Sequence, residues 1–66
     1  MKVRNLEMKK ILLDNCVILY EVHDEISGTY EYYKEHNNDL KYLFGVGEPF
    51  MLESMQRLYD NGYFDV

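Results

Sequence analysis

The stretch from residue 17 to residue 46, VILYEVHDEISGTYEYYKEHNNDLKYLFGV, decides the fold class of this chain. It contains three segments rich in β-branched, aromatic and other apolar residues, at 17–23, 29–36 and 39–46. Ser27-Gly28 separates the first two segments, and Asn37-Asn38 separates the second from the third. Glycine and asparagine most readily adopt the positive φ of a tight hairpin turn. The stretch therefore predicts a three-stranded antiparallel meander.

Two-residue turns would determine which residues share each face of this sheet. They set Val22 opposite Tyr33 and Tyr33 opposite Tyr42, and residues that pair directly point to the same side. One face is then expected to be apolar and to carry Tyr20, Val22, Tyr33, Leu40, Tyr42 and Phe44. The other face is expected to be solvated and to carry Glu21, His23, Tyr32, Lys34, Lys41 and Leu43.

The residues before the meander permit two interpretations. We predict a short amphipathic helix over residues 5–14, because Asn5 can act as its N-cap and apolar residues follow at helical spacings. Asn15 is then expected to end this helix in the left-handed conformation. The alternative is a strand over residues 9–13 followed by a turn at Asp14-Asn15, since the apolar run there is too short for its period to decide.

A second helix is predicted after the meander. It is expected to begin at Glu48 or Pro49 and to end at Asp60 or Asn61, with Gly62 closing it in a Schellman motif. Its apolar stripe should cover the apolar sheet face with Phe50, Leu52, Met55, Leu58 and Tyr59. The expected fold is therefore α+β, one domain over residues 1–66: a short N-terminal helix, a three-stranded antiparallel β-meander, and a C-terminal helix packed on one sheet face (αβββα).

Charge is distributed unevenly along the 66 residues. Residues 1–13 carry four basic side chains and one acidic one, a balance of +3, whereas residues 14–66 carry −8, which gives the net −5. An acidic body repels nucleic acid and is steered toward basic surfaces. The single Cys16 cannot form an intrachain disulfide, and no apolar run approaches the roughly 20 residues of a membrane helix. We expect a cytoplasmic protein that binds neither membrane nor nucleic acid directly.

No catalytic, cofactor or metal motif is evident in the sequence. His23 and His36 are expected at opposite ends of the meander, where they cannot share a metal ion. The acidic residues lack the D-x-D-x-D-G spacing of a calcium loop, and Gly45 and Gly47 lack the further residues of a phosphate loop. Cys16 is interpreted as a small apolar residue. We therefore expect no enzymatic activity, no cofactor and no metal.

The tyrosine content points instead to binding. The chain has seven tyrosines, and one short helix cannot cover all of them. Exposed tyrosines among carboxylates are typical of protein-binding surfaces. We predict a partner-binding row of carboxylates that imitates nucleic-acid phosphates, together with two tyrosines: Asp24, Glu25, Glu31, Glu35, Asp39, Tyr30 and Tyr32. The expected partner is a protein with a basic surface, a nuclease being one such protein.

In size, charge and expected order of elements, the chain resembles small phage-encoded inhibitors. These include type II anti-CRISPR proteins, which place a short helix, a three-stranded sheet and a helical covering in one acidic domain. The resemblance implies an inhibitor that occupies a basic nucleic-acid-binding groove, and it assigns no role to any single residue. Two alternatives stay open: a self-associating structural or adaptor module, with a homodimer formed at a sheet edge, and an antitoxin that neutralises a basic toxin.

Overall fold

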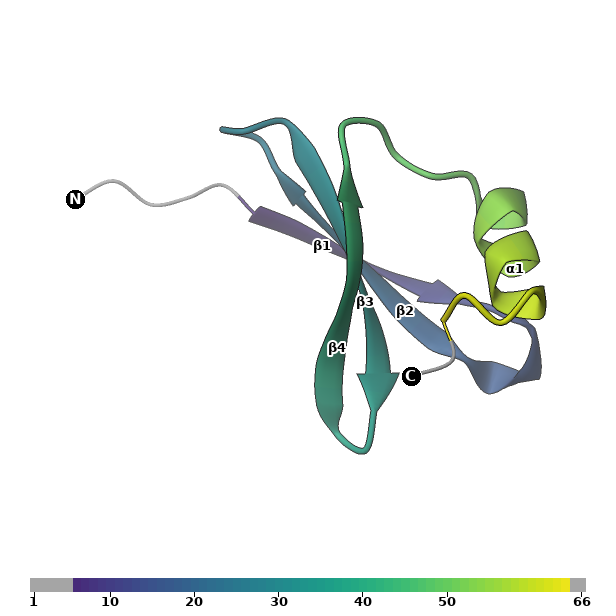
Figure 1. Cartoon of the computed structure of the whole chain (residues 1–66). Helices are drawn as coiled ribbons and strands as arrows, with labels where there is room; N and C mark the ends of the chain where they lie inside the picture. The colour runs from purple at the N-terminus through teal and green to yellow at the C-terminus, as the bar shows by residue number, and fades with distance from the viewer. Residues whose placement is uncertain (1–5, 65–66) are drawn as a thin grey trace.

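The protein is an antiparallel sheet of four strands with one helix on one of its faces, as described for residues 6–64 by a computed structural model (Figure 1). The strands follow one another in space as they do in sequence: β1 (Leu6–Leu12), β2 (Ile18–Asp24), β3 (Thr29–His36) and β4 (Asp39–Val46). The helix is α1 (Leu52–Asp60). The α+β class and the C-terminal helix are confirmed, whereas the sheet has four strands rather than three.

The predicted helix over residues 5–14 is wrong, because Leu6–Leu12 is the first strand of the sheet. At the end of this segment burial alternates from one residue to the next: Ile11 and Leu13 are buried while Leu12 is exposed. A ten-residue helix is too short to be stable by itself, whereas a strand gains pairing with β2 along its whole length. A 3-10 turn, Asp14–Cys16, joins the two strands, and Cys16 takes the left-handed conformation in it with φ 61°.

The two hairpin turns differ in how well they were predicted. Asn37 and Asn38 have φ values of 50° and 66°, and Tyr33 pairs with Tyr42, both as expected. The first turn is longer than expected, because Asp24 pairs with Thr29 across four residues. The β2–β3 register is therefore displaced by two residues, and Tyr33 lies opposite Tyr20 instead of Val22. A displacement of two leaves every side chain on its predicted face.

A β-bulge in β4 changes the face of one important residue. The register of β3 against β4 shifts between Tyr32 and Tyr33, so that Phe44 pairs with Tyr32 and Leu43 is the extra residue. Phe44 was predicted beside Tyr42 on the apolar face. The bulge turns it to the opposite side, where it packs on Tyr32 with ring centroids 5.0 Å apart.

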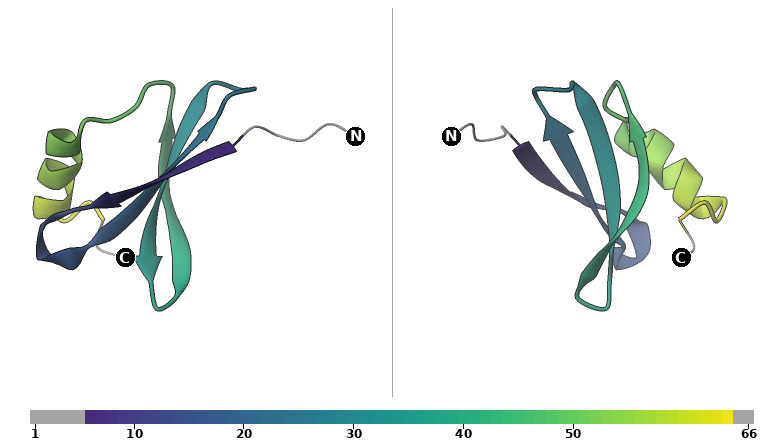
Figure 2. Two further views of the ribbon diagram at one scale, coloured as in Figure 1. Left: turned by 180° about the vertical axis from the view of Figure 1, so that it is seen from behind. Right: turned by 60° about the vertical axis from the view of Figure 1, so that its left-hand side comes forward.

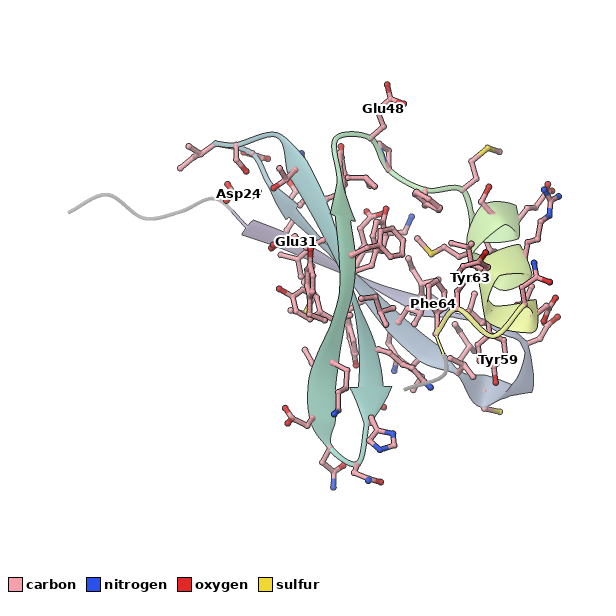
Figure 3. All side chains as sticks on the ribbon, in the orientation of Figure 1. Asp24, Glu31, Glu48, Tyr59, Tyr63 and Phe64 are labelled. Atoms are coloured by element: carbon pink, nitrogen blue, oxygen red, sulfur yellow. The ribbon has the colours of Figure 1, made fainter. Side chains whose placement is uncertain are left out.

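The helix covers the face that was predicted to be solvated, which corrects the expected packing. This covered face holds an aromatic cluster whose neighbouring rings have centroids 5.0 to 6.0 Å apart: Tyr32, Phe44, Phe50 and Phe64. The fully or nearly buried hydrophobic residues of the described chain are Ile11, Leu13, Leu19, Tyr32, Met55 and Phe64. Figure 3 shows Phe64 on the same side of the sheet as α1. The hydrophobic core therefore lies between this face, α1 and the segment that follows it.

The ends of α1 show why the helix packs where it does. It begins at Leu52 rather than at Glu48 or Pro49, because the Phe50 N–H donates to the Tyr32 hydroxyl (2.8 Å) and holds the preceding segment extended. Its end is as predicted: Gly62 has φ 80° and its N–H donates to the carbonyl of Tyr59 (3.0 Å). The Tyr63 N–H donates to the carbonyl of Leu58 (3.0 Å), which completes the Schellman motif.

Candidate protein-binding face

The side of the sheet opposite α1 has no helix over it within the described part of the chain (Figures 1 and 2). Strand pairing puts alternate residues of each strand on this side. We call it the open face; it carries Met8, Lys10, Leu12, Ile18, Tyr20, Val22, Glu31, Tyr33, Glu35, Leu40 and Tyr42. Several of its large apolar side chains are exposed, with Met8 at 62%, Leu12 at 63% and Tyr42 at 55%. Exposed large apolar side chains gathered on one face are a feature of interaction sites.

Three tyrosines form a row across the middle of the open face. Tyr20, Tyr33 and Tyr42 lie directly opposite one another on β2, β3 and β4, and Lys10 of β1 continues the row beside Tyr20. The Tyr33 and Tyr42 rings meet edge to face with centroids 5.5 Å apart. We call these three residues the tyrosine row. It presents apolar ring surface and hydroxyl groups together, which suits a protein interface.

Two carboxylates flank the tyrosine row along β3. Glu35 accepts a hydrogen bond from the Tyr20 hydroxyl (3.5 Å). Glu31 lies on the other side, where burial and then the negative charge of Glu31 raise the pKa of Tyr33 above its usual value. Figure 3 shows Glu31 projecting from the side of the sheet away from α1. The environment of Tyr33 therefore favours the protonated form of its hydroxyl.

The lack of a side chain at Gly45 leaves the space that the Tyr42 side chain occupies. A Cβ atom at Gly45 would lie 3.0 Å from the Tyr42 hydroxyl oxygen and 3.7 Å from Cγ of Glu31. Gly45 pairs with Glu31 across the β3–β4 ladder, so the absent side chain leaves space over which Tyr42 lies. The ring orientation at this end of the tyrosine row thus depends on a glycine.

The structure separates the five predicted phosphate-like carboxylates. By strand pairing, Asp24, Glu31 and Glu35 lie on the same side of the sheet. Asp24 is only 5% exposed, and its carboxylate accepts the Ile26 N–H (3.0 Å) within the first turn. Glu25 follows in that turn, and Asp39 lies at the other end of the sheet, opposite His36. These residues do not form one continuous row.

The two predicted binding tyrosines lie on the covered face. Tyr30 is half-buried and stacks on His23, with ring centroids 4.1 Å apart. Tyr32 was expected on a solvated face but is fully buried in the core. Its hydroxyl donates to Glu21 (2.7 Å) and accepts from the Phe50 N–H. Burial, with the neighbouring Glu21 carboxylate, raises the pKa of Tyr32 to about 12.

The residues of the tyrosine row were not predicted as a site, although the sequence contained a signal for them. Tyr20, Tyr33 and Tyr42 had been assigned to one face and were then expected to lie beneath the helix. The row becomes a candidate site only because α1 packs on the other side. Tyr33 lies between Glu31 and Glu35 with a period of two, a spacing that puts all three side chains on one face of a strand.

The histidines and the cysteine of residues 6–64 are dispersed over the fold. These residues include no group of three or more histidine, cysteine, aspartate or glutamate side chains that could hold a metal ion. His23 pairs with Tyr30 and His36 with Asp39, near opposite ends of β3. Cys16 is exposed rather than part of the apolar interior. No helix in this part of the chain is long and apolar enough to cross a membrane.

The chain matches no protein-family model, no curated protein and no solved structure. The resemblance to phage inhibitors rested on size, charge and the order helix, three strands, helix. The observed order of four strands followed by one helix removes the last of these three grounds. Function is therefore inferred from the open face.

Proposed function

We propose that this protein is a small acidic binding protein whose open face docks on a basic surface of a partner protein. The observation that carries the proposal is the position of α1, which leaves the tyrosine row uncovered. A small sheet that exposes several large apolar side chains gains free energy when a partner removes them from water. The neighbouring carboxylates define the charge of that partner.

The partner chemistry that fits best is arginine among aliphatic side chains. A guanidinium can stack on a tyrosine ring and also donate two hydrogen bonds to a carboxylate. Tyr33 lies between Glu31 and Glu35 on β3, so the open face presents a ring with an anion on either side. Single-stranded nucleic acid also stacks on aromatic rows, but these carboxylates and the net charge of −5 oppose its phosphates.

Inhibition would follow where the partner uses the same basic surface to hold nucleic acid. The carboxylates of Glu31 and Glu35 would then occupy positions that phosphates take, with the tyrosines supplying apolar contact. An antitoxin that neutralises a basic toxin would use the same contacts. Competition with an oligonucleotide for the partner, weakening as salt is raised, is the expected behaviour.

The test is a titration of the labelled protein with a synthetic peptide of alternating arginine and leucine, followed by amide chemical shifts. The largest shifts are expected at Tyr20, Tyr33, Tyr42 and Gly45. A peptide in which glutamate replaces arginine should give no shifts. Shifts confined to α1 and the segment after it, or none with the arginine peptide, would contradict the proposal.

Two matched pairs of variants assign the binding to the open face. Tyr42→Ser should weaken binding about tenfold through lost ring contact, whereas Tyr63→Ser, at an exposed tyrosine after α1, should change it less than about twofold.

The double variant Glu31→Gln/Glu35→Gln should also weaken binding. Glu48→Gln/Glu53→Gln removes the same net charge elsewhere on exposed surface and is the control. Equal effects of the two double variants would show attraction by net charge alone.

A further inference from the structure

The outer edge of β1 is a second candidate binding surface, and its residues indicate which strand could pair with it. β1 is the first strand in the sheet order, and no other strand among residues 6–64 pairs with its outer side. Its pairing with β2 is regular along all seven residues, so the edge is free of bulges. The opposite edge, β4, is interrupted by a bulge, a feature that protects edges from pairing. A regular edge of this kind can accept another strand where the charges on the two strands are complementary.

Symmetry restricts how a second copy could pair with this edge. Two identical antiparallel strands are related by a two-fold axis perpendicular to the sheet, which keeps both open faces on one side. Because residues directly opposite each other point to the same side, the axis must lie midway between one residue and the same residue of the second copy. An axis at Glu7, Lys9 or Lys10 sets that charged residue opposite the same residue of the second copy. Like charges that lie directly opposite each other are destabilising.

An axis at Met8 sets no like charges opposite each other. It pairs Met8 with Met8 of the second copy, an apolar contact between side chains that are 62% exposed in one copy. It also sets Glu7 of each copy opposite Lys9 of the other. Both residues lie on the covered face, so each dimer would contain two cross-strand pairs of opposite charge. This register uses residues 6–10 of each strand.

The start of β1 lies farther from α1 than its carboxyl end does. Phe50, just before α1, and Leu52, its first residue, line a cavity with residues 9–12 of β1. Beside Glu7 and Met8 the surface is hollowed by a cavity of about 300 Å³, which Pro49 also lines. In Figure 2, α1 lies near the carboxyl end of β1 and away from its start. A strand paired at residues 6–10 would thus avoid the helix.

We infer that two copies of this chain associate through their β1 edges in the register centred on Met8, which joins the two sheets into one of eight strands. The two open faces would then lie side by side on one surface, so a dimer could engage two basic sites at once. The inference does not depend on the proposed function, because no residue of the tyrosine row takes part in the pairing.

A charge-swap experiment tests the register. By sedimentation, the wild-type chain should show a reversible dimer at about 100 μM, as expected for a small interface. Glu7→Lys would set two lysines opposite each other in each cross-strand pair, and Lys9→Glu would set two glutamates opposite each other. Each variant should lower the association constant about tenfold when studied alone. Mixing the two variants pairs opposite charges again and should restore dimers at the wild-type level.

Recovery on mixing cannot come from repair of the fold, because each chain keeps its own substitution. A wild-type chain that stays monomeric at about 100 μM would overturn the inference. So would a mixture that stays as dissociated as its components. A dimer dissociated by Tyr42→Ser but not by the charge variants would place the contact on the open face instead.

Cross-linking gives a second measurement of the same register. In a Cys16→Ser background, Met8→Cys would bring two cysteines opposite each other across the axis, at a separation that a disulfide can span. Oxidation should then give a covalent dimer. Leu12→Cys lies at a similarly exposed position on the same face but away from the axis, and it should give little dimer. Equal cross-linking by both cysteines would contradict the register.

Discussion

Tyr32 and Tyr33 are neighbours in the sequence, yet they lie on opposite faces of the sheet and differ in burial and in contacts. Tyr32 is fully buried on the covered face, and its hydroxyl has a donor and an acceptor partner. Tyr33 lies on the open face with its ring against Tyr42. The same residue type thus serves as a core residue on one face and as part of a candidate binding surface on the other.

The comparison shows that the number of aromatic residues on a face does not decide which face a helix covers. The covered face has phenylalanines at its centre, because the bulge adds Phe44 and the chain supplies Phe50 and Phe64. The open face keeps tyrosines, whose hydroxyls can stay in contact with water. Burial of the rings that have no polar atom is the more favourable arrangement.

The largest expected difference between the faces is in stability. Tyr32→Ala should lower the free energy of unfolding by about 3–5 kcal/mol, because it empties a fully buried site and removes two hydrogen bonds. Tyr33→Ala should cost about 1 kcal/mol, mainly the ring contact with Tyr42. Urea unfolding followed by circular dichroism measures both. Equal losses for the two variants would contradict the assignment of the core to one face.

Removal of the Tyr32 hydroxyl is expected to have an intermediate effect on the free energy of unfolding, and this effect should depend on pH. Tyr32→Phe leaves the Phe50 N–H and Glu21 without this partner and should cost about 1–3 kcal/mol at neutral pH. The unfolded chain releases this proton near pH 10, whereas the folded chain holds it to about 12. The unfolded state thus binds fewer protons in this window, and wild-type stability should fall as pH rises through it.

Unfolding measured from neutral pH to pH 12 checks this expectation. The difference between wild type and Tyr32→Phe should shrink across the upper window, because the variant has no proton to release there. Tyr63→Phe, at an exposed position, is the control and should follow the wild type throughout. A constant difference between wild type and Tyr32→Phe would show that the hydroxyl ionises alike in both states.

Much of the sheet could be predicted from local chemistry. Asn37 and Asn38 specified their turn, and a turn of the right length fixed the pairing of Tyr33 with Tyr42. Gly62 likewise specified the end of α1. The first turn was predicted less well, because Asp24 lengthens it by accepting the Ile26 N–H. Even so, an error of two residues preserved the faces, since side chains alternate with a period of two.

The errors came from contacts between residues distant in sequence. Residues 6–12 form a strand because β2 offers a partner along its length, whereas the short apolar run by itself permitted both a helix and a strand. The bulge that moves Phe44 and the hydrogen bond from Phe50 to Tyr32 together bring α1 to its face. The candidate site was missed for the same reason, since a row of tyrosines becomes available to a partner only when the helix packs elsewhere.

The smallest expected change in stability is at Gly45, where the open face can be altered with little effect on the core. Gly45→Ala restricts the unfolded chain, which favours folding, but its Cβ would lie 3.0 Å from the Tyr42 hydroxyl oxygen. Because Tyr42 is exposed, its ring can rotate away, and the free energy of unfolding should change by less than about 0.5 kcal/mol. Binding of the arginine peptide should nevertheless weaken, because the edge-to-face pair with Tyr33 is disturbed. If stability and binding both stayed at wild-type values, the arrangement of that ring would have no part in recognition.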